Sequence, residues 1–171
     1  MENQIPAITS FKNEYWAFSN FYKVPIIYED KEYPSVEHAF HAAKTLDLSL
    51  RIQFQTQEEI DNAQGILKQL GQSFPTTIEL SPSQAKTQGR RLSLKLDWEE
   101  VKLGIMYELN LYKFTHDKLC REKLLSTGDA QLVEGNGWGD KFWGVCVRSG
   151  IGKNHLGKIL MRIRDELHVR G

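Results

Sequence analysis

The sequence contains few cysteines and no long apolar segment. Only two of its 171 residues are cysteine, Cys120 and Cys146, and they form no CxxC pair. This usage is typical of a reducing compartment and argues against a disulfide scaffold. No N-terminal signal sequence and no run of apolar residues long enough to span a bilayer is present. We therefore expect a cytoplasmic protein without a membrane partner.

The chain also carries no excess of charge. Lysine and arginine together number 22, and aspartate and glutamate together also number 22. Because there is no global positive field, any contact with nucleic acid requires a local basic patch. Hydrophobic residues make up 40% of the sequence, which favours a globular fold over disorder. The length predicts a single domain over residues 1–171.

Residues 33–44 form the most informative segment of the sequence. They contain three alanines with high helix propensity, and their apolar residues recur at the spacing of one helix face. On such a helix Glu37, His41 and Lys44 fall within about 60° of one another. One short helix therefore presents a carboxylate, an imidazole and an amine together. The alternative is a charged face that is simply solvated.

Other periodic segments predict further helices and a few short strands. A stripe from Ile60 to Leu70, followed by Gly71 as a C-cap, indicates a helix that we assign to the scaffold, with a lid as the alternative. Pro34 is expected in the first turn of the helix over residues 34–44. Further helices are expected near residues 48–54, 82–88, 98–114, 117–126 and 156–167, and strands near residues 5–11, 25–28, 32–33, 132–134 and 145–148.

Two glycine-rich segments indicate functional loops. Residues 135–144 contain four glycines, two tryptophans and Asp140, a composition that is costly to order and poor at forming regular structure. Residues 150–157 lead into the last helix, where Lys153 and Asn154 suggest either a phosphate site or an ordinary helix start. Neither segment is a P-loop.

Several single residues allow two interpretations. Trp98 either fills part of the core or provides a surface on which a base stacks. Asn20 is either a turn residue or a residue that hydrogen-bonds a hydroxyl group or the edge of a base. The pair Arg90-Arg91 is either solvated or a phosphate binder. His38 and His41 lie three residues apart without a clear third ligand, so no metal site is predicted. The candidates that remain are a carboxylate and an amine on one helix, a second acid in a loop with tryptophans and glycines, and two possible phosphate sites. This set suits a nucleotide or ribosyl ligand better than a peptide.

These motifs together resemble the NADAR (YbiA-like) family. The resemblance covers nearly the whole chain in the family's order. It rests on residues 18–21, 33–40, 43–44, 89–90, 97–98, 132–134, 140–144 and 152–157, with Lys102 and Met106. One departure is His41, where the family often has glutamine, so this residue is expected to tune substrate contact rather than carry the chemistry.

The resemblance implies a compact α+β domain that is mostly helical, with a few short strands. It also implies hydrolysis of an N-glycosidic bond without a cofactor. Substrates in the family include phosphoribosylamino-pyrimidine intermediates of riboflavin synthesis and ADP-ribosylated guanine in nucleic acid. The implied partner is thus a nucleotide-like small molecule carrying ADP-ribose or a phosphoribosyl group, or ADP-ribosylated DNA or RNA.

Roles follow for the matched residues. Glu37 and Asp140 are the carboxylates that stabilise an oxocarbenium-like ribose or activate water, with the division between them left open. Lys44 either attacks the ring-opened sugar as a nucleophile or is a charge partner of Glu37. The predicted substrate-binding residues are Ser19, Asn20, Phe21, His38, His41, Arg90, Trp98, Trp143, Gly144, Lys153 and Asn154.

A second class of function fits the same residues. A non-catalytic module that binds NAD or ADP-ribose also needs a nucleotide pocket. It differs in tolerating neutral replacements of Glu37, Lys44 and Asp140 without losing affinity.

Overall fold

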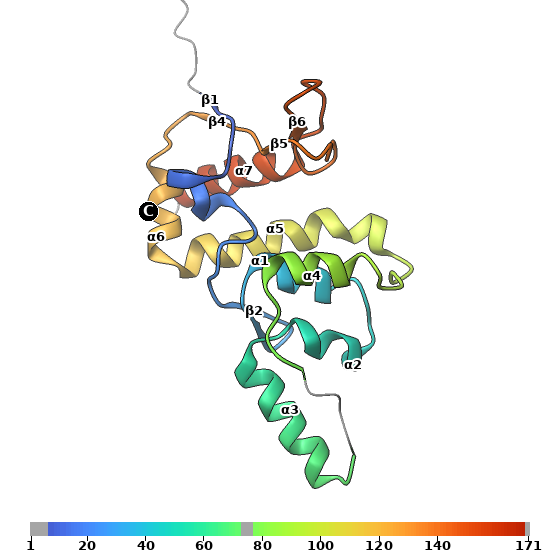
Figure 1. Cartoon of the computed structure of the whole chain (residues 1–171). Helices are drawn as coiled ribbons and strands as arrows, with labels where there is room; N and C mark the ends of the chain where they lie inside the picture. The colour runs from blue at the N-terminus through green and yellow to red at the C-terminus, as the bar shows by residue number, and fades with distance from the viewer. Residues whose placement is uncertain (1–6, 73–76, 170–171) are drawn as a thin grey trace, which may run out of the picture. The chain divides into compact units, whose positions relative to one another are not determined.

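The computed structural model describes residues 7–72 and 77–169 of the chain, and the fold there is mostly helical (Figure 1). This agrees with the α+β class expected from the sequence. Two short 3-10 helices are η1 (Asn13–Phe18) and η2 (Ile52–Phe54). The α-helices are α1 (Val36–Ala42), α2 (Leu48–Arg51), α3 (Gln57–Gln69), α4 (Pro82–Gly89), α5 (Trp98–His116), α6 (Lys118–Leu125) and α7 (His155–Val169).

The described strands are short and form three separate pairs. β1 (Ala7–Ile8) pairs in parallel with β4 (Gln131–Leu132), and β5 (Gly135–Asn136) pairs in parallel with β6 (Val145–Cys146). β2 (Ile26–Tyr28) and β3 (Lys31–Tyr33) cover two of the expected strands and form an antiparallel hairpin. Glu29 and Asp30 at its turn have positive φ values of 48° and 58°, as two-residue hairpin turns require. Residues 5 and 6 of the first predicted strand lie outside the described residues.

The chain divides into two compact units. One comprises Met1–Tyr22 with Met106–Gly171, and the other comprises Lys23–Ile105. The boundary falls inside α5, whose first turns belong to the second of these units and whose remaining turns belong to the first. We call them the terminal unit and the central unit. The prediction of one domain over residues 1–171 stays a prediction.

The central unit is built around α1. All seven residues of this helix are buried, and the helix packs against α4, beside which it runs in Figure 1. The helix begins at Val36, so the prediction that Pro34 lies in its first turn is wrong. Ser35 is extended, with φ −165°, and its hydroxyl bonds a side chain within the helix instead of capping a backbone amide.

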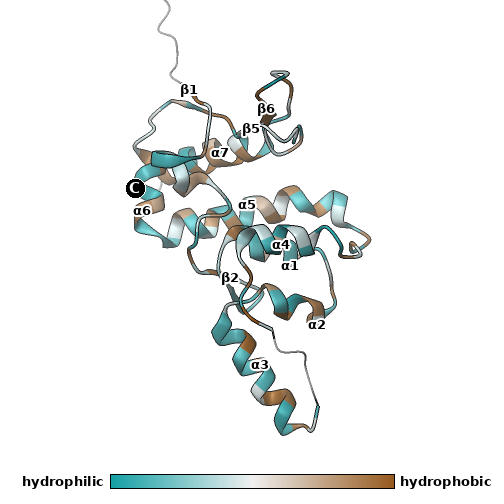
Figure 2. Cartoon of the chain, in the orientation of Figure 1, coloured by the Kyte–Doolittle hydropathy of each residue, from teal (hydrophilic) through white to brown (hydrophobic). Residues whose placement is uncertain are grey.

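The predicted apolar stripe of α3 is buried only at its beginning. Ile60 is fully buried, whereas Ile66 and Leu70 are 59% and 68% exposed. Figure 2 shows a few hydrophobic positions along the otherwise largely hydrophilic α3. The helix ends as expected at Gly71. This residue has φ +70°, and the amide of Gln72 donates to the carbonyl of Leu67 at 2.9 Å, which is a Schellman motif.

The terminal unit has its own core. The rings of Phe11 and Phe114 lie 5.6 Å and 6.3 Å from that of Phe18, and α7 contributes the fully buried Leu160 and Ile163. Among the described residues, no helix combines the length and the apolar character needed to cross a membrane.

Candidate active site

The helix α1 places a carboxylate and an imidazole against each other inside the central unit. Nε2 of His41 donates a hydrogen bond to Oε1 of Glu37 at 3.0 Å, and the two side chains are only 5% and 10% exposed. The spacing i, i+4 on one helix is what brings them together, as the sequence predicted. Burial lowers the pKa of His41, against the opposing effect of Glu37. The imidazole is therefore a neutral donor to the carboxylate at neutral pH.

The amine of Lys44 lies just beyond the end of α1, beside the same carboxylate. Its Nζ donates to the carbonyl of Gly89 at 3.3 Å and lies 5.8 Å and 5.9 Å from the ring centroids of Phe40 and Trp98. Burial lowers the pKa of Lys44 to about 8, with Glu37 acting in the opposite direction and Arg90 adding to the lowering. A lysine with such a pKa is a usable nucleophile near neutral pH.

Gly89, the last residue of α4, is pressed against the imidazole of His41. A Cβ at this position would lie 2.1 Å from Nδ1 of His41, so only glycine fits. Nδ1 is buried and has no hydrogen-bond partner within the described residues. Protonation of Nδ1 would leave a buried N–H without an acceptor, which is costly. The contact thus keeps the imidazole neutral and aimed at Glu37.

Trp98 is a wall of this site rather than a free stacking surface. The residue is 5% exposed, and its ring lies 5.0 Å from that of Phe40 at an interplanar angle of 55°. The structure therefore favours the core alternative over stacking of a base on this ring. Together, the two aromatic side chains shield the Lys44 amine from water, and this desolvation lowers the pKa of Lys44.

His38, which the sequence placed among the substrate-binding residues, is used inside the fold. It is fully buried, with Nδ1 accepting from the Ser35 hydroxyl and Nε2 donating to the carbonyl of Leu80, each at 2.8 Å. Both ring nitrogens are hydrogen-bonded within the fold, and the substrate contact of His38 stays a prediction. The pKa of His38 is lowered by burial. The residue ties α1 to the segment that leads into α4.

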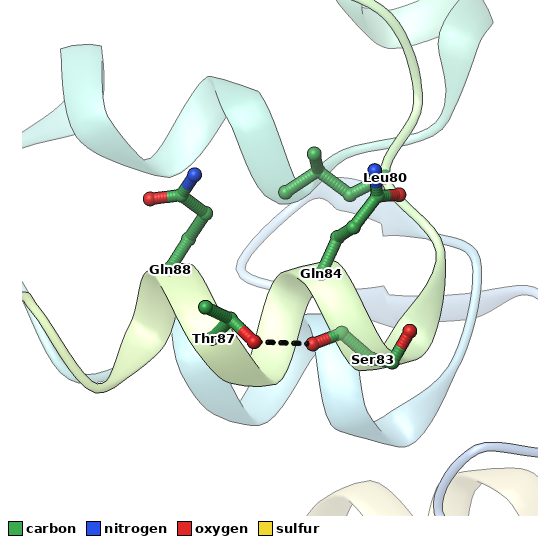
Figure 3. Close-up of a pocket in the computed structure, with 5 residues that line it drawn as sticks. All are labelled: Leu80, Ser83, Gln84, Thr87 and Gln88. Carbon is green, nitrogen blue, oxygen red and sulfur yellow. Dashed lines mark hydrogen bonds between the residues drawn. The ribbon is translucent and has the colours of Figure 1, made fainter.

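Arg90 follows Gly89 and is exposed, so its guanidinium is accessible as a phosphate site requires. The nearby pocket on α4, of about 220 Å³, does not include it (Figure 3). That pocket is open, and beside it the Thr87 hydroxyl donates to the carbonyl of Ser83. Its lining residues are Leu80, Ser83, Gln84, Thr87 and Gln88. No predicted site residue is among them.

In the terminal unit, Asp140 organises the tryptophan-glycine loop. Its Oδ1 accepts from the backbone amides of Phe142 and Trp143 at 2.9 Å and 3.0 Å. Asn136, 2% exposed, clamps the backbone of Asp140 through both ends of its amide, at 2.7 Å and 2.9 Å. Asp140 thus has a structural task in this loop, and its catalytic role stays a prediction. Asn136 was not singled out from the sequence.

Two aromatic residues of this loop, Phe142 and Trp143, lie at the start of α7. The Phe142 ring lies 4.9 Å from Trp143, nearly perpendicular to it, and 4.5 Å from His155. The exposed Lys153 has its amine 5.6 Å from the Phe142 centroid. Trp143 is half-buried, so part of its ring is accessible. The loop therefore offers aromatic surface beside a cation.

Two predicted substrate-binding residues hold this loop together. The Asn154 amide accepts from the Glu134 backbone at 3.0 Å and donates to the Leu132 carbonyl at 2.8 Å, so both of its ends are used inside the fold. This geometry argues against a phosphate-binding role for Asn154. Gly144 is buried, and a Cβ there would lie 2.1 Å from the carbonyl oxygen of Glu134. Its role is close backbone packing.

The segment from Ser19 to Phe21 is half-buried in the terminal unit and rests on α5. Sequence reasoning missed the two α5 residues that contact it, Asn110 and Lys113. Both are fully buried. Their spacing from Met106 places them on the buried stripe of the helix, and a lysine at such a position was the available signal.

No group of three or more histidine, cysteine, aspartate or glutamate side chains suited to a metal ion occurs among the described residues. In the central unit the structure brings together Glu37, His41, Lys44 and Trp98. A buried carboxylate beside an amine of lowered pKa can act on an electrophilic sugar carbon by nucleophilic attack and charge stabilisation. We place the candidate active site here.

Comparison with known proteins gives concordant matches. A family model described as the NADAR domain matches residues 9–168. The N-glycosidase YbiA of Escherichia coli is 34% identical over 171 residues, covering 99% of this chain and 92% of that protein. The N-glycosidase Npun_R5314 of Nostoc punctiforme is 36% identical over 160 residues, covering 90% and 86%.

A plant protein and a solved structure extend the comparison. The chloroplastic riboflavin biosynthesis protein PYRR of Zea mays is 32% identical over 162 residues, covering 88% of this chain but 23% of that longer protein. The NMR structure of E. coli YbiA superposes with a TM-score of 0.74 at 31% identity, covering 99% of this chain and 88% of the other.

Proposed function

Since the chain belongs to the NADAR family and is an N-glycosidase, we propose that it acts in the cytoplasm on a phosphoribosyl or ADP-ribosyl group N-linked to a base. The observation that carries this proposal is the Lys44 amine, whose pKa burial lowers to about 8, beside the Glu37 carboxylate that His41 holds in place. An N-glycosidase needs such groups because its transition state develops positive charge on the ribose.

In the proposed reaction, Lys44 is the nucleophile. Its neutral amine attacks C1′ of the sugar, the C1′–N bond to the base breaks, and the base leaves with a proton. Opening of the sugar ring gives an imine between C1′ and Nζ, which water hydrolyses to the free sugar and the amine. The neighbouring Phe40 and Trp98 rings favour the neutral amine by excluding water.

Glu37 supplies the negative charge beside the reacting carbon. Its Oε1 accepts from His41, and its Oε2 makes no hydrogen bond within the part of the chain that the structure describes. That oxygen can stabilise the oxocarbenium-like sugar or take a proton from the attacking water. His41 positions the carboxylate and carries no proton of the reaction. Asp140 remains the second candidate carboxylate, located in the terminal unit.

The remaining predicted residues are proposed to recognise the substrate. Trp143 offers a half-exposed ring to the base or ribose, while Arg90 and Lys153 are exposed cations suited to phosphate. Asn20 and Phe21 are half-buried in the terminal unit and remain predicted substrate-binding residues. The free metabolite is the preferred substrate, because the net charge is zero and a riboflavin biosynthesis protein is among the relatives.

The test is base release from two substrates in parallel, in the presence of a chelator. One is ADP-ribosylated guanine, as nucleoside and within DNA, and the other is the phosphoribosylamino-pyrimidine of riboflavin synthesis. Mass spectrometry follows the free base. We expect release from one of them, lowered about a hundredfold or more in Glu37→Gln and in Lys44→Ala.

Matched surface variants serve as controls. Glu58→Gln and Lys68→Ala change an exposed carboxylate and an exposed amine on α3 and should leave the rate unchanged. Borohydride added during turnover should trap the sugar on Lys44, seen as a mass increase of its peptide. Absence of this adduct under turnover contradicts the covalent role, and absence of release from either substrate contradicts the proposed substrate class.

A further inference from the structure

The segment that contains α4 is basic, although the chain as a whole is neutral. Residues 80–96 contain Lys86, Arg90, Arg91 and Lys95 and no aspartate or glutamate. All four cations belong to the central unit, which also contains the candidate active site. The dipole of α4 favours cations in its last turn, but Lys95 lies beyond the helix. The dipole therefore does not account for the whole basic segment.

Two of these cations, Lys86 and Arg90, lie close to the amine of Lys44. They are four residues apart at the end of α4, where the amide of Arg90 donates to the carbonyl of Lys86 at 3.2 Å. Between them, Gly89 provides the carbonyl that accepts from Nζ of Lys44 at 3.3 Å. After burial, which is the main cause, the charges of Arg90 and Lys86 lower the pKa of Lys44. The contact and the charge effects together place both cations at the candidate active site.

The protein balances this positive charge only in part. Glu37 on α1 is the acid that acts on Lys44, and the loop before α5 approaches through Lys95, whose amide donates to the Lys44 carbonyl at 2.8 Å. The side chain of Arg90 is exposed and makes no hydrogen bond or ion pair within the described residues. Two like charges four residues apart destabilise a helix, and an anion bound between them removes the repulsion. The arrangement therefore favours an anionic ligand.

Phosphate is the anion that this pair of side chains suits. A guanidinium offers a planar fork of donors to two phosphate oxygens, and an ammonium adds a compact positive charge. A phosphate on the sugar of the substrate is joined through a few bonds to C1′, the atom that Lys44 attacks in the proposed reaction. A cation pair beside Lys44 is therefore within reach of such a phosphate.

We propose that Lys86 and Arg90 form an anion subsite that binds a phosphate group on the sugar of the substrate. The proposal rests on the proposed function, because the phosphate belongs to the N-linked phosphoribosyl or ADP-ribosyl group. It goes further by adding Lys86, which the sequence did not single out, and by making the phosphate a requirement. The same base on an unphosphorylated ribose should therefore be a poor substrate.

Binding of the phosphate should change the ionisation of Lys44. The bound anion offsets the two positive charges that help to lower the pKa of Lys44, so this pKa rises in the complex. The rise of kcat with pH, which reports the complex, should therefore lie at higher pH than the rise of kcat/KM, which reports the free enzyme. In Lys86→Gln and in Arg90→Gln, which each lack one charge, the rise of kcat/KM should move to higher pH. A loss of packing alone would not move it.

The kinetic test compares two forms of the substrate that the wild type cleaves, with and without phosphate on the ribose, at about pH 9, where Lys44 is largely deprotonated. The wild type should have a kcat/KM at least about a hundredfold lower for the unphosphorylated form. Lys86→Gln and Arg90→Gln should each lower kcat/KM for the phosphorylated form about ten- to a hundredfold, the loss of one charged hydrogen bond. For the unphosphorylated form they should stay within about threefold of the wild type.

The matched control is Lys68→Gln, which removes an exposed amine on α3 and should match the wild type for both forms. Equal losses of kcat/KM for the two forms in Lys86→Gln and Arg90→Gln overturn the subsite. A rise of kcat/KM that stays at the same pH in both variants overturns the placement of the two cations beside Lys44.

A second measurement uses inorganic phosphate and does not depend on turnover. At constant ionic strength, with chloride as the reference, added phosphate should shift the backbone amide NMR signals of Gly89, Arg90 and Arg91. The affinity should be at least about tenfold lower in Lys86→Gln and in Arg90→Gln and unchanged in Lys68→Gln. Unshifted signals, or equal affinity in all proteins, overturn the proposal.

The two measurements separate this proposal from the proposed function. If the wild type cleaves neither substrate, the proposed function fails, and the phosphate titration alone decides whether the anion subsite exists. If one of the two variants does not fold, the other carries the same test.

Discussion

At the scale of single residues, the most consequential groups are two amines taken out of water. Lys44 and Lys113 each have a pKa of about 8, lowered chiefly by burial. Lys44 lies beside a carboxylate and has an exposed fraction, whereas Lys113 is fully buried and contacts the backbone. The first is suited to chemistry and the second to holding a turn. Their environments, not their shared residue type, separate the two roles.

The pH dependence of the reaction distinguishes the two roles open to Lys44. If its neutral amine attacks the sugar, kcat/KM should rise with pH and level off above about 8, where the amine is deprotonated. If the ammonium serves as a charge partner of Glu37, kcat/KM should instead fall above about 8. We expect the rising profile, measured between about pH 6 and 10. The control is Lys113→Met, which should show the same pH profile. In that case the rise in kcat/KM with pH is due to Lys44 and not to Lys113.

Replacement of His41 by glutamine should leave activity within about threefold and make the fold more resistant to acid. An amide N–H can donate to Glu37 as the imidazole does. The folded pKa of His41 lies below its ordinary value of 6.5, so the unfolded chain binds more protons below pH 6.5. Stability is therefore lost as pH falls through 6.5, and glutamine removes this contribution.

The measurement is thermal unfolding of both proteins at pH 8 and at a series of values below 6.5. The melting temperature of the wild type should fall more steeply on acidification than that of His41→Gln. His38, whose pKa is also lowered, keeps part of the acid sensitivity in the variant. If the melting temperatures of the two proteins fall equally steeply with pH, the acid sensitivity of the fold is not due to His41.

The central site residues were predictable because Glu37 and His41 lie on one helix and Lys44 follows directly after its end. The spacing of Glu37, His41 and Lys44 dictates their proximity, and the structure brings them together. The structural tasks of His38 and Asn154 were not predictable, because their partners, Leu80 and Leu132, lie far away in the sequence. The burial of Lys113 was missed for a similar reason: an isolated charge on an apolar stripe is ordinarily assigned to the surface.

At the scale of elements, helix periodicity in the sequence located the α-helices well but not their degree of burial. The stripe of α3 has the amphipathic pattern of a packed helix, yet Ile66 and Leu70 are exposed. Periodicity reports which face is apolar, whereas a second element must cover that face for it to be buried. The loop over residues 135–144 also contains β5, because its backbone pairs with β6 despite the glycines.

The packing of α4 on α1 makes Gly89 a sensitive position. Gly89→Ala would place a Cβ 2.1 Å from His41 and force the two helices apart. We expect a loss of about 2 to 3 kcal/mol in the free energy of unfolding and at least a tenfold loss of activity. Chemical denaturation and base release measure the two effects.

Gly104 provides the matched control. It lies in α5, and a Cβ there would meet nothing within 4 Å. Gly104→Ala should therefore stabilise the protein by about 0.5 to 1 kcal/mol, through helix propensity alone. A Gly89→Ala protein as stable and active as Gly104→Ala would contradict the tight contact between α1 and α4.

At the scale of the whole molecule, the balance of charge predicts a weak response to salt. The net charge is zero, with 22 basic and 22 acidic residues, so no long-range field attracts polyanions. A nucleic-acid binder with six to ten phosphate contacts loses about a thousandfold or more in affinity between about 50 and 200 mM salt. For ADP-ribosylated DNA we expect a change in kcat/KM of less than about tenfold over this range.

The control for this experiment is the ADP-ribosylated nucleoside, which has no DNA backbone and so makes no backbone-phosphate contacts that salt could weaken. Its kcat/KM should be at least as high as that of the DNA substrate. A steep salt dependence seen only with DNA would instead indicate a local basic groove, with the exposed pair Arg90-Arg91 as the first residues to replace. The overall class of the fold was predictable from the family resemblance, whereas the two-unit organisation was not, since its boundary lies inside one continuous helix.

The contact between Gly89 and His41 also constrains how relatives of this chain can diverge. Because the imidazole fills the space that a side chain at position 89 would need, the two positions are not free to vary independently. A Cβ at position 89 would also lie 2.7 Å from the Cβ of His41, so any residue with a side chain at position 41 requires glycine at position 89 in this packing. Natural sequences should therefore keep glycine at the last residue of α4 wherever the last turn of α1 carries a side chain at position 41.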